Sequence, residues 1–295
     1  MRDLSQRALD TATAKGAGYA DVRLVRRLEE SISIKTGRVE GVASGESEGF
    51  GVRVLVDGAW GFASSHVLTA DEADRVAAEA VRIARASATA LRNQTRLDDR
   101  PLAHGTYETP LEEDPFAIPL ETKIGDLLAA DQLAASVKGI AFTESTYAAQ
   151  REWKTFAATD GSLTEQTITH VGAGIEAHAV DGDEHQRRSY PDSGGGWGGG
   201  GYEIVRRQRL NETAGPLAEE AVELLSAPQC PSGRFTVILD PSQLYLQVHE
   251  SCGHPTELDR VFGTEASYAG TSFLTTDKLD SGFRYGSDPR TALGY

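Results

Sequence analysis

The sequence has 295 residues, of which 39% are hydrophobic, enough to bury a substantial core and to form about two domains. A net charge of −15 argues against a nucleic-acid-binding surface, because phosphate contacts need clustered Lys and Arg. Two cysteines are too few for a disulfide framework, and no stretch is apolar enough for a signal peptide or a membrane span, so we expect a cytoplasmic protein.

The pattern of apolar, polar and turn residues in the first part of the chain predicts a helix, several strands and a second helix. Apolar residues recur at helical spacing over residues 3–15. Alternating polar and apolar segments then predict an antiparallel meander with turns at glycines, one of them near Gly45. Its expected strands are residues 21–28, 30–35 and 49–56, and a further strand at Trp60 and Phe62. A capping box from Thr69 to Glu72 opens the second helix.

The next part predicts a second group of helices and strands. Prolines make residues 93–119 a connection. The elements expected after it are a helix over 120–137, strand-like segments over 139–149 and 151–158, a returning strand over 162–180 and a helix over 214–227. His170 and His178 share one face of the returning strand and could be ligands. Isolated strand histidines are more often hydrogen-bonded surface or groove residues.

A glycine-rich segment, residues 193–201, has the most unusual composition of the chain. One interpretation is a flexible linker. The other is a substrate loop around Trp197 and Gly198, where a peptide backbone approaches closely and the indole ring offers a stacking surface. A phosphate-binding loop is excluded because no Gly-Lys-Ser/Thr follows.

The most specific pattern lies in residues 234–259. The β-branched and aromatic segment 235–239 predicts a buried strand, and Asp240 and Pro241 are suited to the N-cap and first turn of a helix directly after it. His249 and Glu250 would lie on this helix, and His254 follows five residues after His249. The expected fold is therefore α+β, with antiparallel β-meanders and hairpins packed with amphipathic helices, followed by a strand-to-helix unit that carries these residues.

Two imidazoles beside a carboxylate are what a hydrolytic zinc site needs. The imidazoles bind the metal, and the carboxylate takes a proton from a water whose pKa the metal lowers. On a regular α-helix, a spacing of five residues separates two side chains by roughly 140°, too far for one ion. A π-type widening would bring His249 and His254 together, and so would a helix that ends at Gly253. Gly253 and Pro255 favour the second possibility.

The segment HESCGHPTELD, residues 249–259, resembles the HExxxH signature of the TldD/PmbA family of metalloproteases. Residues 271–274 and 285–287, the glycine-rich segment and the hairpin-rich N-terminal half also resemble this family. The PmbA (TldE) branch lacks the motif, so the chain resembles the TldD branch. The resemblance implies that His249 and His254 bind Zn²⁺ and that Glu250 is the general base.

A catalytic zinc ion normally has three protein ligands. The resemblance implies that the third is a cysteine far into the C-terminal half of a considerably longer protein, so the chain resembles a truncated product. The substitutes within the chain are Cys252, Cys230, Glu257 and Asp259. Cys252 is expected to be a packed small side chain. Glu257 and Asp259 could instead orient the histidines.

We therefore expect residues 1–228 to form an N-terminal α+β domain with two parts, about 1–92 and 120–228, and residues 229–295 to begin an incomplete metalloprotease domain. The resemblance implies hydrolysis of unfolded or short peptides, and a PmbA/TldE-like subunit or a homo-oligomer as partner. Little or no proteolysis is expected of the chain alone. The alternatives are a non-catalytic assembly subunit with a vestigial site and another zinc-dependent amide hydrolase.

Overall fold

The computed structural model describes residues 2–91, 94–97, 101–268 and 270–275. The chain divides into two compact units, Met1–Pro228 and Gln229–Tyr295. We call them the N-terminal unit and the C-terminal unit. The described residues contain no helix that is both long and apolar enough to cross a membrane.

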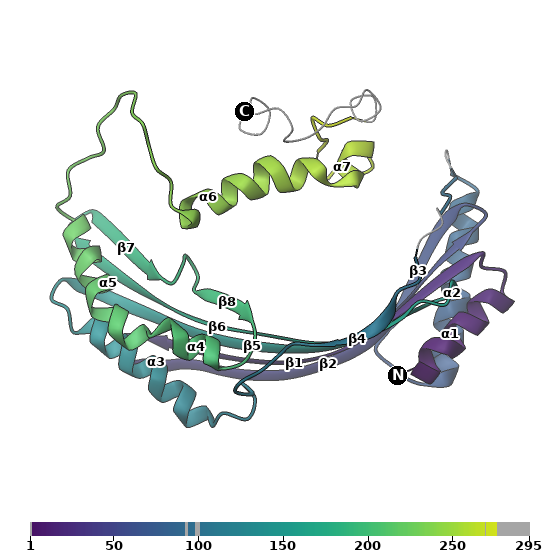
Figure 1. The fold of residues 1–295 in the computed structure, drawn as a ribbon, viewed down its shortest axis with the longest axis horizontal. Helices are drawn as coiled ribbons and strands as arrows, with labels where there is room; N and C mark the ends of the chain where they lie inside the picture. Colours follow the sequence, from purple (N-terminus) through teal and green to yellow (C-terminus); the bar gives the residue numbers. More distant parts are fainter. Residues whose placement is uncertain (1, 92–93, 98–100, 269, 276–295) are drawn as a thin grey trace. The chain divides into compact units, whose positions relative to one another are not determined.

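The described part of the N-terminal unit combines one sheet of eight strands with five helices (Figure 1). The strands are β1 (Tyr19–Lys35), β2 (Arg38–Val56), β3 (Ala59–Ser65), β4 (His104–Glu108), β5 (Ile140–Ala158), β6 (Leu163–Asp181), β7 (Glu184–Tyr190) and β8 (Gly196–Gly199). The helices are α1 (Arg2–Ala14), α2 (Ala70–Ala88), α3 (Leu120–Ala135), α4 (Glu203–Gln208) and α5 (Leu210–Leu224). The expected α+β class with an antiparallel sheet and packed helices is confirmed.

The strands follow the order β3-β2-β1-β5-β6-β4, and β7 and β8 also pair with β6. Neighbouring strands are antiparallel, except that β4 runs parallel to β6. Because β1 pairs with β5 along 15 residues, the two predicted parts of this unit share one continuous sheet. Each part nevertheless has its own helices and its own hydrophobic core.

The strands of the meander are longer than their patterns predict. Residues 21–28 and 30–35 belong to one strand, and Gly45 lies inside β2, opposite Glu29, where a turn was expected. The turn prediction at Gly45 is therefore wrong. Since β1 is hydrogen-bonded on both edges, to β2 and β5, the ladder continues through the polar residues that interrupt its alternation.

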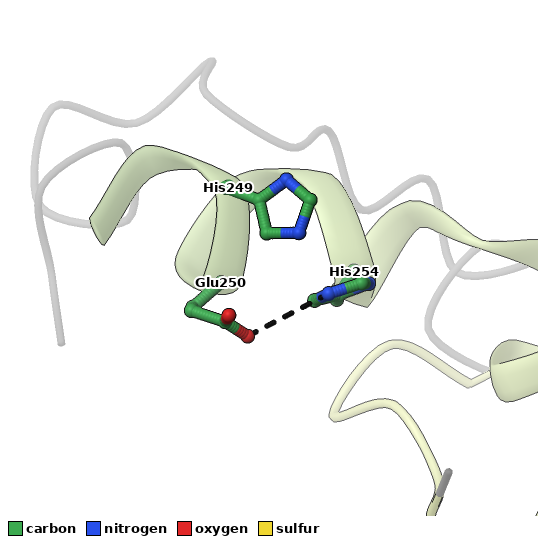
Figure 2. Close-up of side chains that lie close together, drawn as sticks. All are labelled: His249, Glu250 and His254. Carbon is green, nitrogen blue, oxygen red and sulfur yellow. Dashed lines mark ion pairs between the residues drawn. The ribbon is translucent and has the colours of Figure 1, made fainter. Parts of the chain in front are cut away.

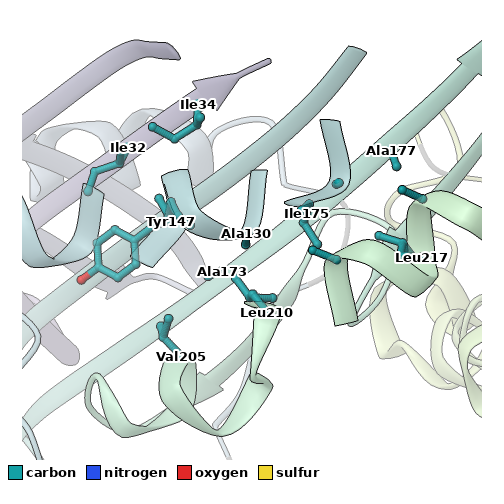
Figure 3. Packing of buried hydrophobic residues seen from close by; sticks show 14 of the residues in the cluster. Ile32, Ile34, Ala130, Tyr147, Ala173, Ile175, Ala177, Val205, Leu210 and Leu217 are labelled. Carbon is teal, nitrogen blue, oxygen red and sulfur yellow. The ribbon is translucent and has the colours of Figure 1, made fainter. Parts of the chain in front are cut away.

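Both cores lie on the same face of the sheet, because side chains two residues apart along a strand share a face. On β1, Val22 belongs to the core beneath α1 and α2, and Ile32 belongs to the core beneath α3 and α5. Figure 3 shows the second core, which contains Tyr147 and Ile175 of the sheet and Leu217 of α5. We call the opposite face, which carries Glu144, His170 and His178, the open face.

The C-terminal unit contains α6 (Pro241–Val248), η1 (His249–Gly253), η2 (His254–Thr256) and α7 (Leu258–Phe262). The strand predicted at residues 235–239 is wrong, since the structure describes these residues without regular secondary structure. A strand needs a hydrogen-bonded neighbour, and the described residues of this unit include no other strand. The side chains of Val237 and Ile238 accordingly remain 69% and 98% exposed.

Candidate metal centre

The helix that carries the metal motif begins at Asp240, as predicted. The Asp240 carboxylate accepts a hydrogen bond from the Ser242 N–H at 2.9 Å, and Pro241 is the first residue of α6. The bond from Ser242 also holds the pKa of Asp240 below its ordinary value. The N-cap thus fixes the start of the helix about two and a half turns before His249.

The helix changes its winding at His249. Residues His249–Gly253 form a π-helix, closed by a hydrogen bond from the His254 N–H to the His249 carbonyl, and residues His254–Thr256 continue as a 3₁₀-helix. A π-helix pairs residues five apart, so it returns His254 to the face of His249. The structure therefore has the widened helix, and the preference for a helix that ends at Gly253 is wrong.

This winding brings His249, Glu250 and His254 together (Figure 2). The two ring centroids are 4.4 Å apart with their planes at 78°, and Nε2 of His254 is 3.7 Å from the Glu250 carboxylate. One possible ligand atom from each of the three residues lies within 4.8 Å of the others. The two imidazoles are nitrogen ligands that suit zinc, and the Glu250 carboxylate lies beside them, so the residues fit the metal that the motif implies.

Glu257 orients His254. Its carboxylate lies 2.8 Å from Nδ1 of His254, and its other oxygen lies 2.8 Å from Nε of Arg260. When Nδ1 carries the proton and donates it to Glu257, the lone pair of Nε2 faces Glu250 and His249. Arg260 is not among the predicted site residues, although it lies three residues after Glu257, which itself lies three residues after His254. This spacing could have indicated the chain of contacts.

The other predicted ligand candidates do not join the two histidines. Asp259 gathers with Glu257 and Glu265 in a separate acidic group, where desolvation and the nearby Asp259 raise the pKa of Glu265. Cys230 is exposed and Cys252 is half-buried, and both are free thiols. Among the described residues, neither thiol belongs to the group formed by the histidines and Glu250.

The segment after the motif folds back onto it. The Ser272 hydroxyl donates to the Pro255 carbonyl at 2.6 Å, and the Ser272 N–H donates to the Arg260 carbonyl at 3.1 Å. Leu274 is buried. Residues 271–274 therefore support the helical segment that carries His254, whereas the predicted motif segment 285–287 lies outside the described residues.

The glycine-rich segment is an ordered part of the sheet of the N-terminal unit. Residues Gly196–Gly199 form β8 and pair with β6, so the interpretation as a flexible linker is wrong. Glycines on β6 make this pairing possible: a Cβ at Gly172 would lie 2.4 Å from the Gly196 carbonyl oxygen, and one at Gly174 would lie 2.4 Å from Gly195 Cα. Such contacts would force the two strands apart.

Trp197 of β8 lines a pocket of about 510 Å³ on the open face. Its indole is 52% exposed, and its N–H donates to the Gly194 carbonyl at 3.1 Å. The pocket also includes His170, Gln150 and Glu29, so an exposed aromatic surface lies beside polar and acidic groups. Gly198 lies next to Trp197 in β8, but it does not line this pocket.

Comparison with protein families supports the same family that the motif resembles, from residues outside the motif. The model of PmbA/TldA metallopeptidase domain 1 matches residues 20–84, and that of the PmbA/TldA metallopeptidase central domain matches residues 113–227. A metalloprotease of Methanothermobacter thermautotrophicus is 31% identical over 252 residues, which cover 85% of this chain and 53% of the relative. A metalloprotease of Methanocaldococcus jannaschii is 27% identical over 93% of this chain and 57% of its own length. The chain thus spans about half the length of these relatives.

Solved structures share the fold. A Thermotoga maritima protein described as a candidate modulator of a DNA gyrase aligns with a TM-score of 0.61 and 16% identity, over 79% of this chain and 50% of its own. TldE from Thermococcus kodakarensis aligns with a TM-score of 0.50 and 12% identity, over 75% of this chain and 47% of its own. At these identities the similarity concerns the fold alone.

Proposed function

Because the chain belongs to the PmbA/TldD metallopeptidase family, we propose that it is a zinc-dependent peptidase of the TldD branch. In this proposal His249 and His254 hold the metal and Glu250 is the general base. The observation that carries the proposal is the π-helical segment that brings possible ligand atoms of these three residues within 4.8 Å of one another.

Each residue has a distinct chemical task in the proposed reaction. A bound zinc ion would polarise the scissile carbonyl and make a water molecule more acidic. Glu250 then accepts a proton from the attacking water and passes it to the leaving amine. Glu257 keeps the Nδ1 proton of His254 on the side away from the metal, since the two groups are 2.8 Å apart.

The proposed substrates are unfolded or short peptides, in the cytoplasm. Trp197 supports this substrate class, because an exposed indole beside a pocket can stack on a peptide side chain without selecting one sequence. The proposed partner is a subunit of the PmbA/TldE type, which the shared fold with TldE supports. Since the chain spans about half of its relatives, we expect little or no peptidase activity from it alone.

Metal content tests the ligand assignment directly. The purified chain is dialysed against zinc and its bound metal is measured by mass spectrometry, together with the variants His249→Ala, His254→Ala and the control His66→Ala. Each of the first two changes should lower the zinc content by one equivalent, because the site then keeps only one of its two candidate histidine ligands. The control changes an exposed histidine outside the motif and should leave the zinc content unchanged. Equal zinc content in all four proteins would disprove the assignment.

The role of Glu250 requires an activity measurement. The chain is assayed on labelled unfolded peptides together with a PmbA-type subunit, and Glu250→Gln should keep its zinc but lose the cleavage that the unchanged chain shows, because general-base catalysis contributes about 10²- to 10⁴-fold in rate. Glu219→Gln changes an exposed carboxylate of α5 and serves as the control. Full activity in Glu250→Gln would contradict a general base at this position. Cleavage of small amides in place of peptides would favour a different zinc amide hydrolase.

A further inference from the structure

A second group of possible metal ligands lies on the open face of the N-terminal unit. The pairing of β5 with β6 puts Glu144 directly opposite Glu176, and His178 follows two residues after Glu176 on the same face. Possible ligand atoms of these three residues lie within 4.8 Å of one another. Like charges directly opposite each other in a sheet are destabilising, so a pair of facing carboxylates needs compensation.

Two positively charged side chains on the neighbouring strands offset the repulsion between Glu144 and Glu176. Lys35 of β1 lies 2.7 Å from one oxygen of Glu144, and Arg187 of β7 lies 3.2 Å from one oxygen of Glu176. Because β1 and β7 flank β5 and β6, both cations approach from the outer sides. Each ion pair that the structure describes here uses a single carboxylate oxygen. Among the described residues, no hydrogen bond joins the second oxygen of either carboxylate, so these oxygens can turn towards a ligand.

The third member, His178, has a buried nitrogen that lacks a hydrogen-bond partner. His178 is only 7% exposed, and its ring stacks on Phe142 at a centroid distance of 4.1 Å. Nδ1 of His178 lies 3.1 Å from Nε2 of His185. Nε2 of His178 lies 3.5 Å from the Glu176 carboxylate without forming a hydrogen bond. A buried polar atom in this situation is destabilising unless a ligand satisfies it.

The proton positions explain what kind of ligand would satisfy this atom. A neutral imidazole has one N–H and one lone pair. When Nδ1 of His178 donates its proton to His185, the lone pair of Nε2 is left facing the negatively charged Glu176. A cation between the nitrogen and the carboxylates would interact favourably with all three groups. The contact with His185 would then orient the ring, as neighbouring groups do for ligand histidines in general.

We propose that Glu144, Glu176 and His178 bind a divalent transition-metal ion of the zinc or manganese type. One imidazole nitrogen with two carboxylates suits this class of ion better than calcium, which takes oxygen ligands alone. In tetrahedral zinc sites the ligand atoms are about 3.4 Å apart, so side-chain movements of about 1 Å close the observed group around an ion. The ion would tie β5 to β6 beside the β6–β7 hairpin. This site is independent of the proposed peptidase centre.

The test uses the full chain with the changes His249→Ala and His254→Ala, so that the motif no longer contributes. Equilibrium dialysis against Zn²⁺, and separately against Mn²⁺, measures the bound ion. We expect one ion per chain, and we expect Glu176→Gln and Glu144→Gln each to weaken its binding at least 10-fold. Glu152→Gln is the matched control, because Glu152 also lies on β5 in ion pairs, with Arg27 and Lys154. It should leave the affinity unchanged.

A second measurement locates the ion and does not depend on a variant that folds. Mn²⁺ broadens nearby proton resonances, so titration with Mn²⁺ should broaden the imidazole signals of His178 and His185 before that of His170, which lies elsewhere on β6. The proposal is overturned if the chain with both motif histidines replaced binds no ion. It is also overturned if the Glu144 and Glu176 variants bind as tightly as Glu152→Gln, or if His170 is broadened first.

Discussion

The rings of His249 and His254 approach to 4.4 Å because the helix between them is a π-helix. A regular α-helix would separate positions five apart by roughly 140° around its axis. The 3₁₀-helix that follows then places Glu257, three residues further along the chain, beside Nδ1 of His254. The local backbone therefore brings together the two candidate ligands and the carboxylate that orients one of them.

The contact between Glu257 and His254 predicts an effect on metal affinity. We expect Glu257→Gln to weaken zinc binding by about 10- to 100-fold, because a neutral amide is a poorer acceptor for the Nδ1 proton and no longer orients the ring as firmly. Asp259→Asn is the matched control, since Asp259 lies in the neighbouring acidic group. Competition with a chromophoric chelator measures both affinities. Equal losses in the two variants would mean that overall negative charge, and not the contact with His254, determines the affinity.

The pairing of β8 with β6 predicts that Gly172 is intolerant of a side chain. Gly172→Ala should cost about 1–3 kcal/mol in the free energy of unfolding, because its Cβ would meet the Gly196 carbonyl oxygen at 2.4 Å and the Trp197 ring at 2.5 Å. Gly125→Ala is the control: it lies inside α3 with open space around the new Cβ, and it should stabilise the protein by about 1 kcal/mol. Urea denaturation measures both changes. A stabilised Gly172→Ala would contradict the described packing of β8.

The lowered pKa of Glu203 predicts that this residue contributes to stability in a pH-dependent way. Burial alone would raise its pKa, but hydrogen bonds from the Gly201 N–H at 2.7 Å and the Glu113 N–H at 3.0 Å outweigh burial and hold the pKa below the ordinary 4.5. A carboxyl group whose pKa is lowered on folding stabilises the protein above its unfolded pKa, and this contribution is lost as pH falls through the folded pKa.

We therefore expect Glu203→Gln to lower the free energy of unfolding by about 2 kcal/mol at pH 7, since bonds to a charged acceptor are replaced by bonds to an amide. The difference from the unmodified chain should shrink progressively below pH 4.5. Urea denaturation at several pH values measures this, with the exposed Glu219→Gln as a control that changes little. A difference that stays constant between pH 7 and pH 4 and grows at lower pH would contradict the lowered pKa.

The C-terminal unit should gain stability from the proposed zinc ion. The described residues of α6 include no buried side chain, whereas α3 buries Leu127, Ala130 and Ala134. Helices with little buried area open easily, and an ion that binds the folded form shifts that equilibrium. Hydrogen exchange should therefore slow in residues 241–256 on addition of zinc and stay unchanged in α3. The same measurement on Glu176→Gln removes any contribution from the second proposed metal site. If hydrogen exchange in α3 then slows as much as in residues 241–256, a local effect at the motif is contradicted.

Much of the N-terminal unit could be predicted because its elements follow local patterns. The N-cap of α2 at Thr69 and the helix over Leu120–Ala135 both depend on neighbouring residues. The short strands β4 and β7 could not be predicted in this way. Both are largely exposed and carry little apolar alternation, so only their pairing with β6 makes them strands.

The sequence by itself determined the α+β class, the start of the metal-motif helix at Asp240 and the identity of the candidate ligands, because capping, turn chemistry and residue type act over a few neighbours. Only the tertiary structure decided that residues 196–199 join the sheet, that residues 235–239 form no strand, and that Glu144, Glu176 and His178 meet on one face. Each of these depends on which strand lies alongside, and strand pairing joins residues whose separation in the chain no local pattern encodes.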